Sequence, residues 1–143
     1  MHLIMSVYHD SIDIESSGEN DIIDITEDVQ NVVSRSGLNE GICMVFVAGS
    51  TGTLSTMEYE PGLKQDVPKA LDKIAPKNQE YQHHFTWHDD NGRSHVKATL
   101  MGASLIVPFQ NKKILHGTWQ QLIFIELDTQ PRRRSLIVQL VGE

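Results

Sequence analysis

The sequence has one cysteine, Cys43, and so cannot form an internal disulfide. Such scarcity is typical of a reducing compartment, and we expect a cytoplasmic protein. Cys43 lies in the apolar run 41–47, where we expect a small buried hydrophobic side chain. A chain of 143 residues can bury a sizeable core as one domain, so it needs neither a disulfide nor a metal ion merely to fold.

Basic residues are also scarce, with 12 lysines and arginines against 19 acidic residues and a formal net charge of −7. An acidic surface repels phosphate backbones and anionic lipids, which argues against nucleic-acid and membrane binding. No apolar run approaches the roughly 20 residues of a membrane span. The start of the chain, residues 1–5, is too short an apolar stretch for a secretory signal, so we expect a soluble protein.

No repeat, low-complexity tract or linker divides the chain, and we expect a single domain over residues 1–143. Apolar residues recur at helical spacing over residues 21–36 and again from Asp66, which we take as an N-cap because Pro68 is tolerated in a first turn. Alternating or continuous apolar patterns predict seven strands, over residues 3–15, 42–47, 51–59, 104–109, 113–116, 120–127 and 135–141. The expected fold is α+β with mostly antiparallel sheets.

Histidine is concentrated in one segment, since residues 81–95 hold four of the seven histidines. Imidazole can ligate a transition metal or transfer a proton near neutral pH, so this segment is the first candidate for a functional site. We expect residues 81–95 to be irregular or extended. The pattern of residues 96–101 fits a short helix or a strand equally well.

The loop over residues 49–52, Gly-Ser-Thr-Gly, directly follows the predicted strand 42–47. Its backbone N–H groups and two hydroxyls can surround an anionic oxygen, as a phosphorylated ligand requires. It lacks the lysine and the spacing of a Walker loop, so nucleotide binding is not indicated. A plain turn between two strands is the equal alternative.

Four strings occur in order along the chain: Gly49-Ser-Thr-Gly-Thr-Leu-Ser-Thr-Met-Glu-Tyr-Glu-Pro-Gly62, Tyr81-Gln-His83, Asn91-Gly-Arg-Ser-His95 and Gly117-Thr-Trp-Gln120. Arg134 and a terminal Val-Gly-Glu follow them. Together they resemble the YjbQ-like family, also called the secondary thiamine-phosphate synthase family, over nearly the whole chain. The Gly-Thr-Trp-Gln string and the Ser-His after Asn-Gly-Arg are the most specific parts.

The resemblance implies one α+β domain of two packed sheets, assembled as a homotrimer. It also implies a histidine site that can hold a divalent metal ion, zinc or magnesium. The implied activity is that of a transferase, which joins an aminopyrimidine, released from its diphosphate, to a thiazole phosphate. The expected partners are other copies of the chain and a phosphorylated small molecule.

The chain departs from the family at Gly49, where many members carry a histidine. His83 and His95 match, but two imidazoles alone hold zinc poorly, because a catalytic zinc site usually has three protein ligands and a water. His116, Glu58 and Asp90 are candidates for the missing ligand. Each of these three is more readily explained as a solvated or hydrogen-bonded side chain than as a ligand.

The resemblance assigns further roles by position. His83 and His95 are the expected metal ligands or an acid–base pair, with Glu58 and Gln120 as further catalytic residues. The expected substrate-binding residues are Ser50, Thr51, Asn91, Thr118, Trp119 and Arg134.

Structural alternatives stay open for three of these positions. Trp119 could pack between sheets or subunits, Arg134 could pair with a neighbouring subunit, and Asp66 could do no more than cap its helix.

Two other functions compete with the transferase. A metal- or anion-binding protein without turnover would suit a site weakened at Gly49. A purely structural trimer would use the same histidines at its interfaces.

Overall fold

The computed structural model describes residues 4–143 and has an α+β fold, as the sequence predicts. The strands are β1 (Ser6–Ser16), β2 (Ile22–Asp24), β3 (Gly41–Val47), β4 (Gly52–Met57), β5 (Ser104–Gln110), β6 (Lys113–Ile114), β7 (Gln121–Glu126) and β8 (Arg132–Gly142). The helices are α1 (Thr26–Ser36), α2 (Pro61–Ile74), α3 (Gln82–Trp87) and α4 (Gly92–Met101).

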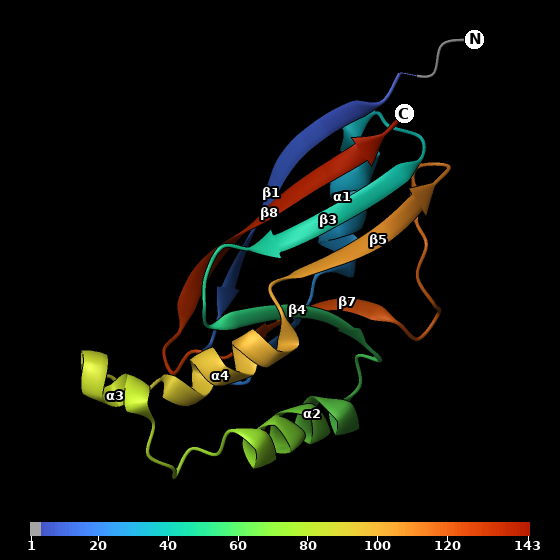
Figure 1. Ribbon diagram of the computed structural model, residues 1–143. Coiled ribbons are helices and arrows are strands. Elements are labelled where there is room, and N and C mark those ends of the chain that lie inside the picture. Colours follow the sequence, from blue (N-terminus) through green and yellow to red (C-terminus); the bar gives the residue numbers. More distant parts are fainter. Residues whose placement is uncertain (1–3) are drawn as a thin grey trace.

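The strands form two antiparallel sheets (Figure 1). The larger sheet has the order β1-β8-β3-β5-β6, and the smaller has the order β2-β7-β4. The long strands β1 and β8 pair along their whole length, with Ile12 opposite Leu136. All pairings are antiparallel, so successive side chains along a strand can alternate between a buried and an exposed face of the sheet.

One face of the larger sheet forms the main core. In β3, Cys43, Val45 and Val47 point into this core, whereas Ile42 and Phe46 are exposed on the outer face. Helix α1 covers the core with three buried valines, Val29, Val32 and Val33. The expectation of a buried Cys43 is confirmed, and burial raises the pKa of its thiol to about 12.

The smaller sheet packs against the main core with one face and against a second core with the other. Leu54, Leu122 and Phe124 face the larger sheet, while Ile123 and Ile125 face helices α2 and α4. This second core includes Leu71 from α2 and Ala98 from α4. The smaller sheet is therefore a middle layer between the larger sheet and the helical layer of α2 and α4 (Figure 1).

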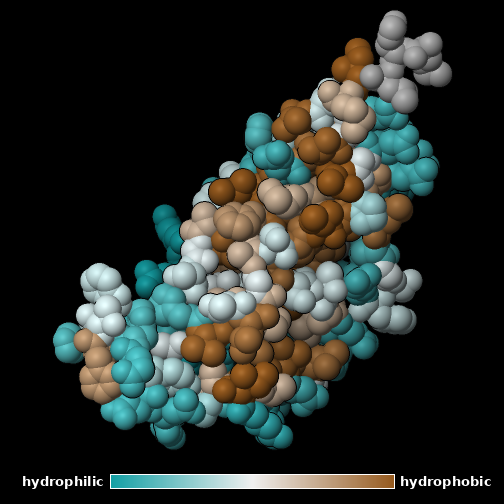
Figure 2. Space-filling model, in the orientation of Figure 1, coloured by the Kyte–Doolittle hydropathy of each residue, from teal (hydrophilic) through white to brown (hydrophobic). Residues whose placement is uncertain are grey.

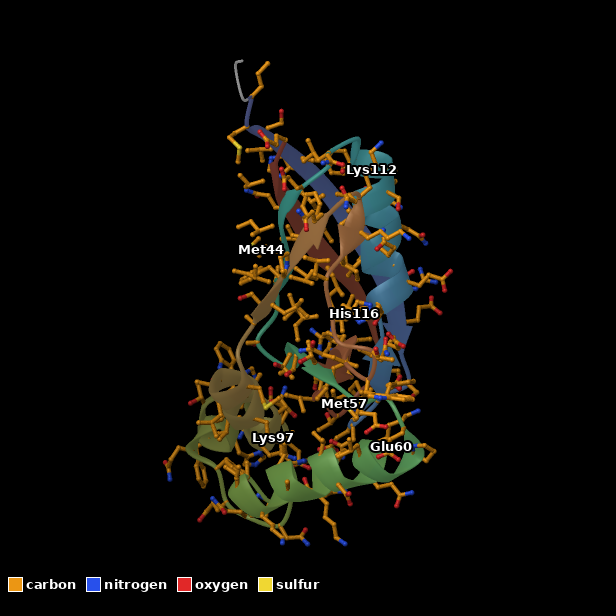
Figure 3. All side chains as sticks on the ribbon, turned by 90° about the vertical axis from the view of Figure 1, so that its right-hand side faces the viewer. Met44, Met57, Glu60, Lys97, Lys112 and His116 are labelled. Carbon is orange, nitrogen blue, oxygen red and sulfur yellow. The ribbon has the colours of Figure 1, made fainter. Side chains whose placement is uncertain are left out.

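Residues 58–103 form one excursion between β4 and β5, and it contains α2, α3 and α4. The excursion begins after Met57, but its end lies beside the opposite, N-terminal end of β4, because the Thr53 hydroxyl donates to the Gly102 carbonyl at 2.5 Å. Figure 3 shows Lys97 of α4 directed toward α2, where its ammonium group is 2.5 Å from an Asp72 carboxylate oxygen. Within residues 4–143, every helix is too short or too polar to cross a membrane.

The first two predicted helices begin at other residues than expected. Ile22–Asp24 forms β2, which pairs with β7, so the first helix starts at Thr26 rather than at residue 21. Helix α2 starts at Pro61, and the side chain of Glu60 caps it by accepting from the N–H groups of Gly62 and Leu63. The N-cap assigned to Asp66 is wrong, because this residue lies inside α2.

The histidine segment is helical, contrary to the irregular or extended conformation expected. Helix α3 and the first turn of α4 occupy it, and residues 96–101 continue α4. The structure thus has four helices instead of two main ones, and eight strands instead of about seven. The extra strand is the short β2.

Candidate functional site

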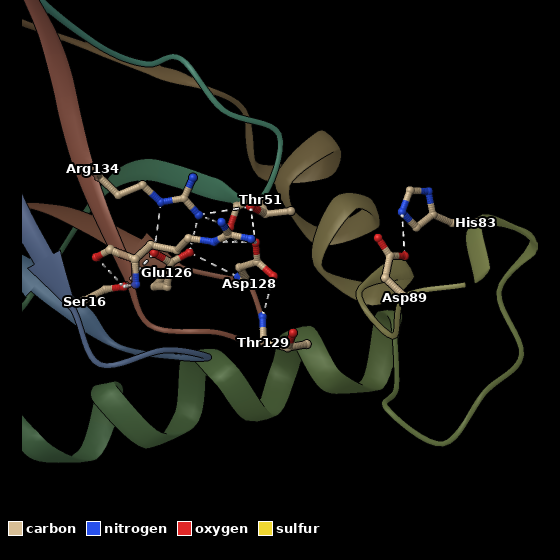
Figure 4. Close-up of polar contacts among 9 residues, drawn as sticks. Ser16, Thr51, His83, Asp89, Glu126, Asp128, Thr129 and Arg134 are labelled. Carbon is tan, nitrogen blue, oxygen red and sulfur yellow. Dashed lines mark hydrogen bonds and ion pairs between the residues drawn. The ribbon is translucent and has the colours of Figure 1, made fainter. Parts of the chain in front are cut away.

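Four polar side chains meet where α3 gives way to α4, and we call them the histidine cluster: His83, Asp89, Asn91 and His95. The rings of His83 and His95 lie with their centroids 4.4 Å apart at an interplanar angle of 49°. An Asp89 carboxylate oxygen lies 3.2 Å from His83 Nε2 (Figure 4). The fold therefore brings together two imidazoles that are twelve positions apart in the sequence.

A tight reversal between the helices creates this approach. Helix α3 ends at His88, which adopts a left-handed conformation and donates its N–H to the His84 carbonyl at 2.6 Å. Gly92 then packs against Tyr81, since a Cβ atom at Gly92 would lie 2.6 Å from the Cβ of Tyr81. A larger residue at Gly92 would push α4 away from α3 and separate the imidazoles.

The amide of Asn91 links the cluster. In the orientation that satisfies its hydrogen bonds, the side-chain nitrogen donates to Asp89 at 2.9 Å and to His83 Nε2 at 3.1 Å. Nε2 accepts from Asn91 when His83 is neutral, and it can donate to Asp89 when the ring is protonated. The cluster thus offers a hydrogen-bond partner to either protonation state of His83.

His95 is a half-buried imidazole. Burial lowers its pKa, and repulsion from His83 lowers it further, while the carboxylates of Asp89 and Asp128 act in the opposite direction. His95 is therefore neutral at neutral pH and has a nitrogen lone pair for a metal ion or a proton.

A second group of polar residues lies around the buried Glu126, and we call it the Glu126 network (Figure 4). Its members are Ser16, Thr51, Glu126, Asp128, Arg132 and Arg134. Arg134 donates from Nε to Glu126 at 3.0 Å and from Nη2 to both Glu126 and the Thr51 hydroxyl. Ser16 donates to Glu126 at 2.7 Å, so this buried carboxylate is fully paired.

Asp128 connects the Glu126 network to the histidine cluster electrostatically. Burial raises the pKa of Asp128, but hydrogen bonds from the Thr129 N–H, the Thr51 hydroxyl and Arg132 outweigh burial, and the net shift is downward. Asp128 is therefore ionised, and its charge slightly offsets the lowering of the His95 pKa by burial and by His83.

Gly49 lies against the guanidinium of Arg134. A Cβ atom at Gly49 would be 2.8 Å from Arg134 Nη1, so a histidine at this position would displace the guanidinium. Ser50, on the exposed loop beside Gly49, precedes the buried Thr51. Arg134 thus fills the space next to the position at which the resemblance led us to expect a third histidine.

A three-ligand metal site is not formed within residues 4–143, where no three His, Cys, Asp or Glu side chains converge. The three residues considered as a third metal ligand do not join the two imidazoles. His116 Nδ1 lies 2.6 Å from the Gln120 carbonyl, Glu58 is exposed after β4, and an Asp90 carboxylate oxygen is 3.4 Å from Arg93. The residues of one chain therefore fit a two-imidazole site, not a complete zinc site.

Four of the predicted site residues lie at the other end of β4. Thr51 precedes this strand and Glu58 follows it, so the two are roughly 20 Å apart along an extended chain. Gln120 donates to the Thr56 hydroxyl at 3.2 Å and accepts from the Gly117 N–H, which places residues 117–120 beside the Glu58 end. The single pocket expected for Glu58, Thr118, Trp119, Gln120 and the histidines is therefore not formed within one chain.

Trp119 is 74% exposed, so the core position considered for it is wrong for the isolated chain. Figure 3 places His116, close to Trp119 in sequence, well away from Lys97 and the helical layer. The Gly-Thr-Trp-Gln string is thus a surface segment of the subunit.

Glu126 and Asp128 were missed in the sequence analysis. Both are carboxylates within or directly after the apolar run 121–127, and both are buried. A charged residue in a buried strand needs a partner, and this pattern could have pointed to Arg132 and Arg134. Arg134 pairs within its own chain, which differs from the intersubunit pair considered above.

Comparison with known proteins agrees with this architecture. The model of the family described as UPF0047 protein YjbQ-like matches residues 10–143. A UPF0047 protein of Methanothermobacter thermautotrophicus is 36% identical over 141 residues, covering 99% of this chain and 96% of the relative. A UPF0047 protein of Archaeoglobus fulgidus is 37% identical over 119 residues, covering 83% of this chain and 90% of the relative.

Solved structures show the same fold. The crystal structure of a YbjQ-like protein of unknown function from Sulfolobus solfataricus P2 aligns with a TM-score of 0.91 at 33% identity, covering 98% of this chain and 100% of that one. A YjbQ/UPF0047 protein from Clostridium acetobutylicum aligns with a TM-score of 0.78 at 32% identity, covering 93% and 98%. The sequence relatives, the family model and the shared fold lead to one conclusion: this chain belongs to the YjbQ-like (UPF0047) family.

Proposed function

We propose that the protein binds a phosphorylated small molecule between the histidine cluster and the Glu126 network, with His83 and His95 as the reactive pair. The observation that supports this proposal most directly is the 4.4 Å approach of the two rings, held by the reversal between α3 and α4. Paired imidazoles next to a carboxylate and an amide are suited to proton transfer and to hydrogen bonding of an oxyanion.

The proposed substrate contacts follow from the positions of the polar groups. Ser50 and Thr51 offer hydroxyls at the loop that precedes β4, and Asn91 offers an amide within the histidine cluster. Arg134 Nη1 points toward Gly49, while Nε and Nη2 are engaged by Glu126 and Thr51. One edge of the guanidinium is thus available to a phosphate oxygen next to Ser50.

For the reaction, we propose the transfer suggested by the family resemblance. The thiazole nitrogen attacks the methylene carbon of the aminopyrimidine, the carbon–oxygen bond breaks, and diphosphate leaves with the electron pair. Hydrogen-bond donors around the departing oxygen stabilise its developing charge, which is usually the largest contribution to such catalysis. Asn91, His95 and Arg134 are the donors we assign to this role.

Turnover of the two phosphorylated precursors, followed by chromatography of the product, tests this proposal. We expect His95→Asn to lower turnover about 100-fold, because a positioned imidazole typically contributes that much. His9→Asn, an exposed imidazole of β1, is the matched control and should leave turnover unchanged. Absence of turnover in the unmodified protein, with and without divalent cations, would exclude the transferase.

A second candidate is binding of a divalent cation without turnover, and the two-imidazole geometry favours it. His83 and His95 would hold the ion, and zinc suits imidazole nitrogens better than magnesium does. When bound, the ion would polarise an oxygen of the ligand. Calorimetric titration with zinc chloride should show binding that His83→Asn and His95→Asn each abolish.

Gly49→His separates these two candidates. It adds a third imidazole but requires Arg134 to move, because Nη1 lies 2.8 Å from the added Cβ. Tighter zinc binding without new activity would favour the cation-binding protein. Loss of turnover together with unchanged zinc affinity would favour the phosphate contact of Arg134.

We further propose that the chain assembles as a homotrimer through the outer face of the larger sheet. This face carries exposed apolar side chains from three strands, among them Ile42, Phe46, Ile106 and Ile137. Figure 2 shows brown, hydrophobic atoms gathered over this face. An exposed apolar patch on a sheet is typical of an interface, and another copy of the chain would cover it.

A further inference from the structure

A cavity of about 410 Å³ borders the histidine cluster on the α3 side, and we call it the α3 cavity. Residues from the loop before α3, from α3 itself and from the reversal after it line this cavity, including Glu80, Tyr81, His84, Phe85, Asp89 and Asp90. Its volume lies within the roughly 300–1,000 Å³ typical of small-molecule sites. Asp89 belongs to the cavity as well as to the histidine cluster.

Tyr81 forms a fixed wall of the α3 cavity. Its hydroxyl donates to the Pro76 carbonyl at 2.6 Å, and its opposite end packs against Gly92, which also lines the cavity. Phe85, one turn further along α3, adds a second ring that is 54% exposed. The two rings give the cavity apolar surfaces suited to a flat group.

The polar groups of the α3 cavity carry negative charge. Glu80, Asp89 and Asp90 line it, and no lysine or arginine of the described chain does. Arg93 lies near Asp90, but Glu19 binds its guanidinium at 2.6 and 2.9 Å. The Asp90 side chain is 81% exposed, so its carboxylate remains open to a ligand.

The remaining ring in the α3 cavity also offers an acceptor. His84 Nδ1 lies 2.8 Å from the Asp89 carbonyl oxygen, so Nδ1 carries a hydrogen and donates to it. In the neutral ring, Nε2 then accepts hydrogen bonds. The cavity therefore combines aromatic surfaces, acceptors and negative charge, a combination that favours cations and disfavours phosphates.

We propose that the α3 cavity binds a flat organic cation, an aromatic or heteroaromatic ring that carries a protonated amine. The ring lies against Tyr81 and Phe85, and the ammonium group faces Asp89 and Asp90. This proposal goes beyond the phosphate site, because it requires neither His95 nor Arg134.

Titration of the full chain with benzylamine and with benzyl alcohol tests the α3 cavity. The two probes share a ring, and only the amine is charged. We expect benzylamine to bind about tenfold more tightly, and both probes to shift the aromatic NMR signals of Tyr81 and Phe85. Equal binding of amine and alcohol, or shifts elsewhere in the protein, would overturn the proposal.

Two variants locate the binding. Asp90→Asn should weaken benzylamine about three- to fivefold and leave benzyl alcohol unchanged, as expected for one exposed ion pair. Asp66→Asn removes an exposed charge from α2 and should change neither probe. If Asp66→Asn weakened benzylamine as much as Asp90→Asn, the general negative charge of the protein would explain the attraction and the cavity would not.

Phe85→Leu separates this cavity from the phosphate site. It should weaken both benzyl probes and leave the binding of inorganic phosphate unchanged. His95→Asn should do the reverse. Loss of benzylamine binding in His95→Asn would mean that the α3 cavity is not an independent site.

Discussion

Gly92 shows how one residue without a side chain positions two others. Its Cα faces the Tyr81 ring so closely that an added Cβ would lie 2.6 Å from the Cβ of Tyr81 and 2.8 Å from Cγ. Tyr81 cannot easily yield, because its hydroxyl is bonded to the Pro76 carbonyl. The approach of His83 to His95 therefore depends on the glycine between them.

Gly92→Ala should destabilise the fold by about 2 kcal/mol, as overpacking of a tight contact does. Urea unfolding followed by circular dichroism measures this change. Gly117→Ala is the matched control, since its added Cβ would meet only Gln120 at 3.4 and 3.5 Å. Equal stability of Gly92→Ala and Gly117→Ala would show that Tyr81 does not limit the approach of α4.

Asp10 carries the clearest carboxylate shift outside the site. A side-chain hydrogen bond from Arg35 lowers its pKa to about 2, with further help from the Ser11 N–H. The Arg35 Nε lies 2.7 Å from the carboxylate oxygen. Because the folded-state pKa is depressed, this stabilisation is present above about pH 4 and is lost as the pH falls toward 2.

Arg35→Gln should raise the pKa of Asp10 toward its ordinary value of 3.8. Carbon-13 NMR of the side-chain carboxyl, followed between pH 5 and pH 2, measures the midpoint. Arg133→Gln provides the control, because Arg133 pairs with Glu15 and not with Asp10. An unchanged Asp10 midpoint in Arg35→Gln would contradict the assignment.

At the scale of elements, α2 shows why the start of a helix is hard to read from sequence. Asp66 before Pro68 fits an N-cap, yet Glu60 caps the helix and Pro61 occupies its first position. Proline in the first turn is tolerated, and here two prolines compete for that role. Pro68 lies inside the helix and is buried, and this burial offsets its missing hydrogen bond.

The two possible starts of α2 predict different effects of mutation. Glu60→Ala should lower the free energy of unfolding by about 1 kcal/mol, because it removes the acceptor for two backbone N–H groups. Asp66→Ala should change it by less than about 0.5 kcal/mol, as usual for an exposed position. Thermal unfolding of both variants measures the difference, and the reverse order would restore the start at residue 66.

The strands of the core were predictable, because β-branched and aromatic residues mark them. The runs 42–47, 104–109 and 135–141 correspond to β3, β5 and β8 within a few residues. The helices α3 and α4 were not, because their polar residues show no apolar stripe. Gln82–Trp87 has no buried residue at all, and its main contact in the fold is with α4.

The site was predictable in part. The dense histidine segment led to His83 and His95, which the structure brings together. The grouping of Gln120 and Glu58 with these histidines could not be tested from sequence, because it depends on the direction in which β4 runs. The predicted strand 51–59 separates Thr51 from Glu58, but the sequence does not reveal which end of that strand lies on the side of the histidines.

At the scale of the whole molecule, the outer face of the larger sheet sets the expected assembly. Ile106 is 63% exposed on β5, and Ile137 is 42% exposed on β8. Ile106→Lys should shift a trimer to smaller species, because a buried lysine without a partner is costly at an interface. Analytical ultracentrifugation measures the shift.

Leu100→Lys is the matched control for the assembly, since Leu100 is 62% exposed but lies on α4. It should leave the sedimentation of the protein unchanged. If the unmodified protein were a monomer, or if the two lysine variants had equal effects, the outer face of the larger sheet would not be the interface.

The excursion between β4 and β5 has a consequence for how relatives can diverge. It leaves β4 after Met57 and is tied near its end to the start of the same strand by the bond from Thr53 to the Gly102 carbonyl. Every residue of the histidine cluster and of the α3 cavity belongs to it. Substitutions within this segment can therefore change the residues of the histidine cluster and of the α3 cavity while the strand pairings of both sheets stay the same.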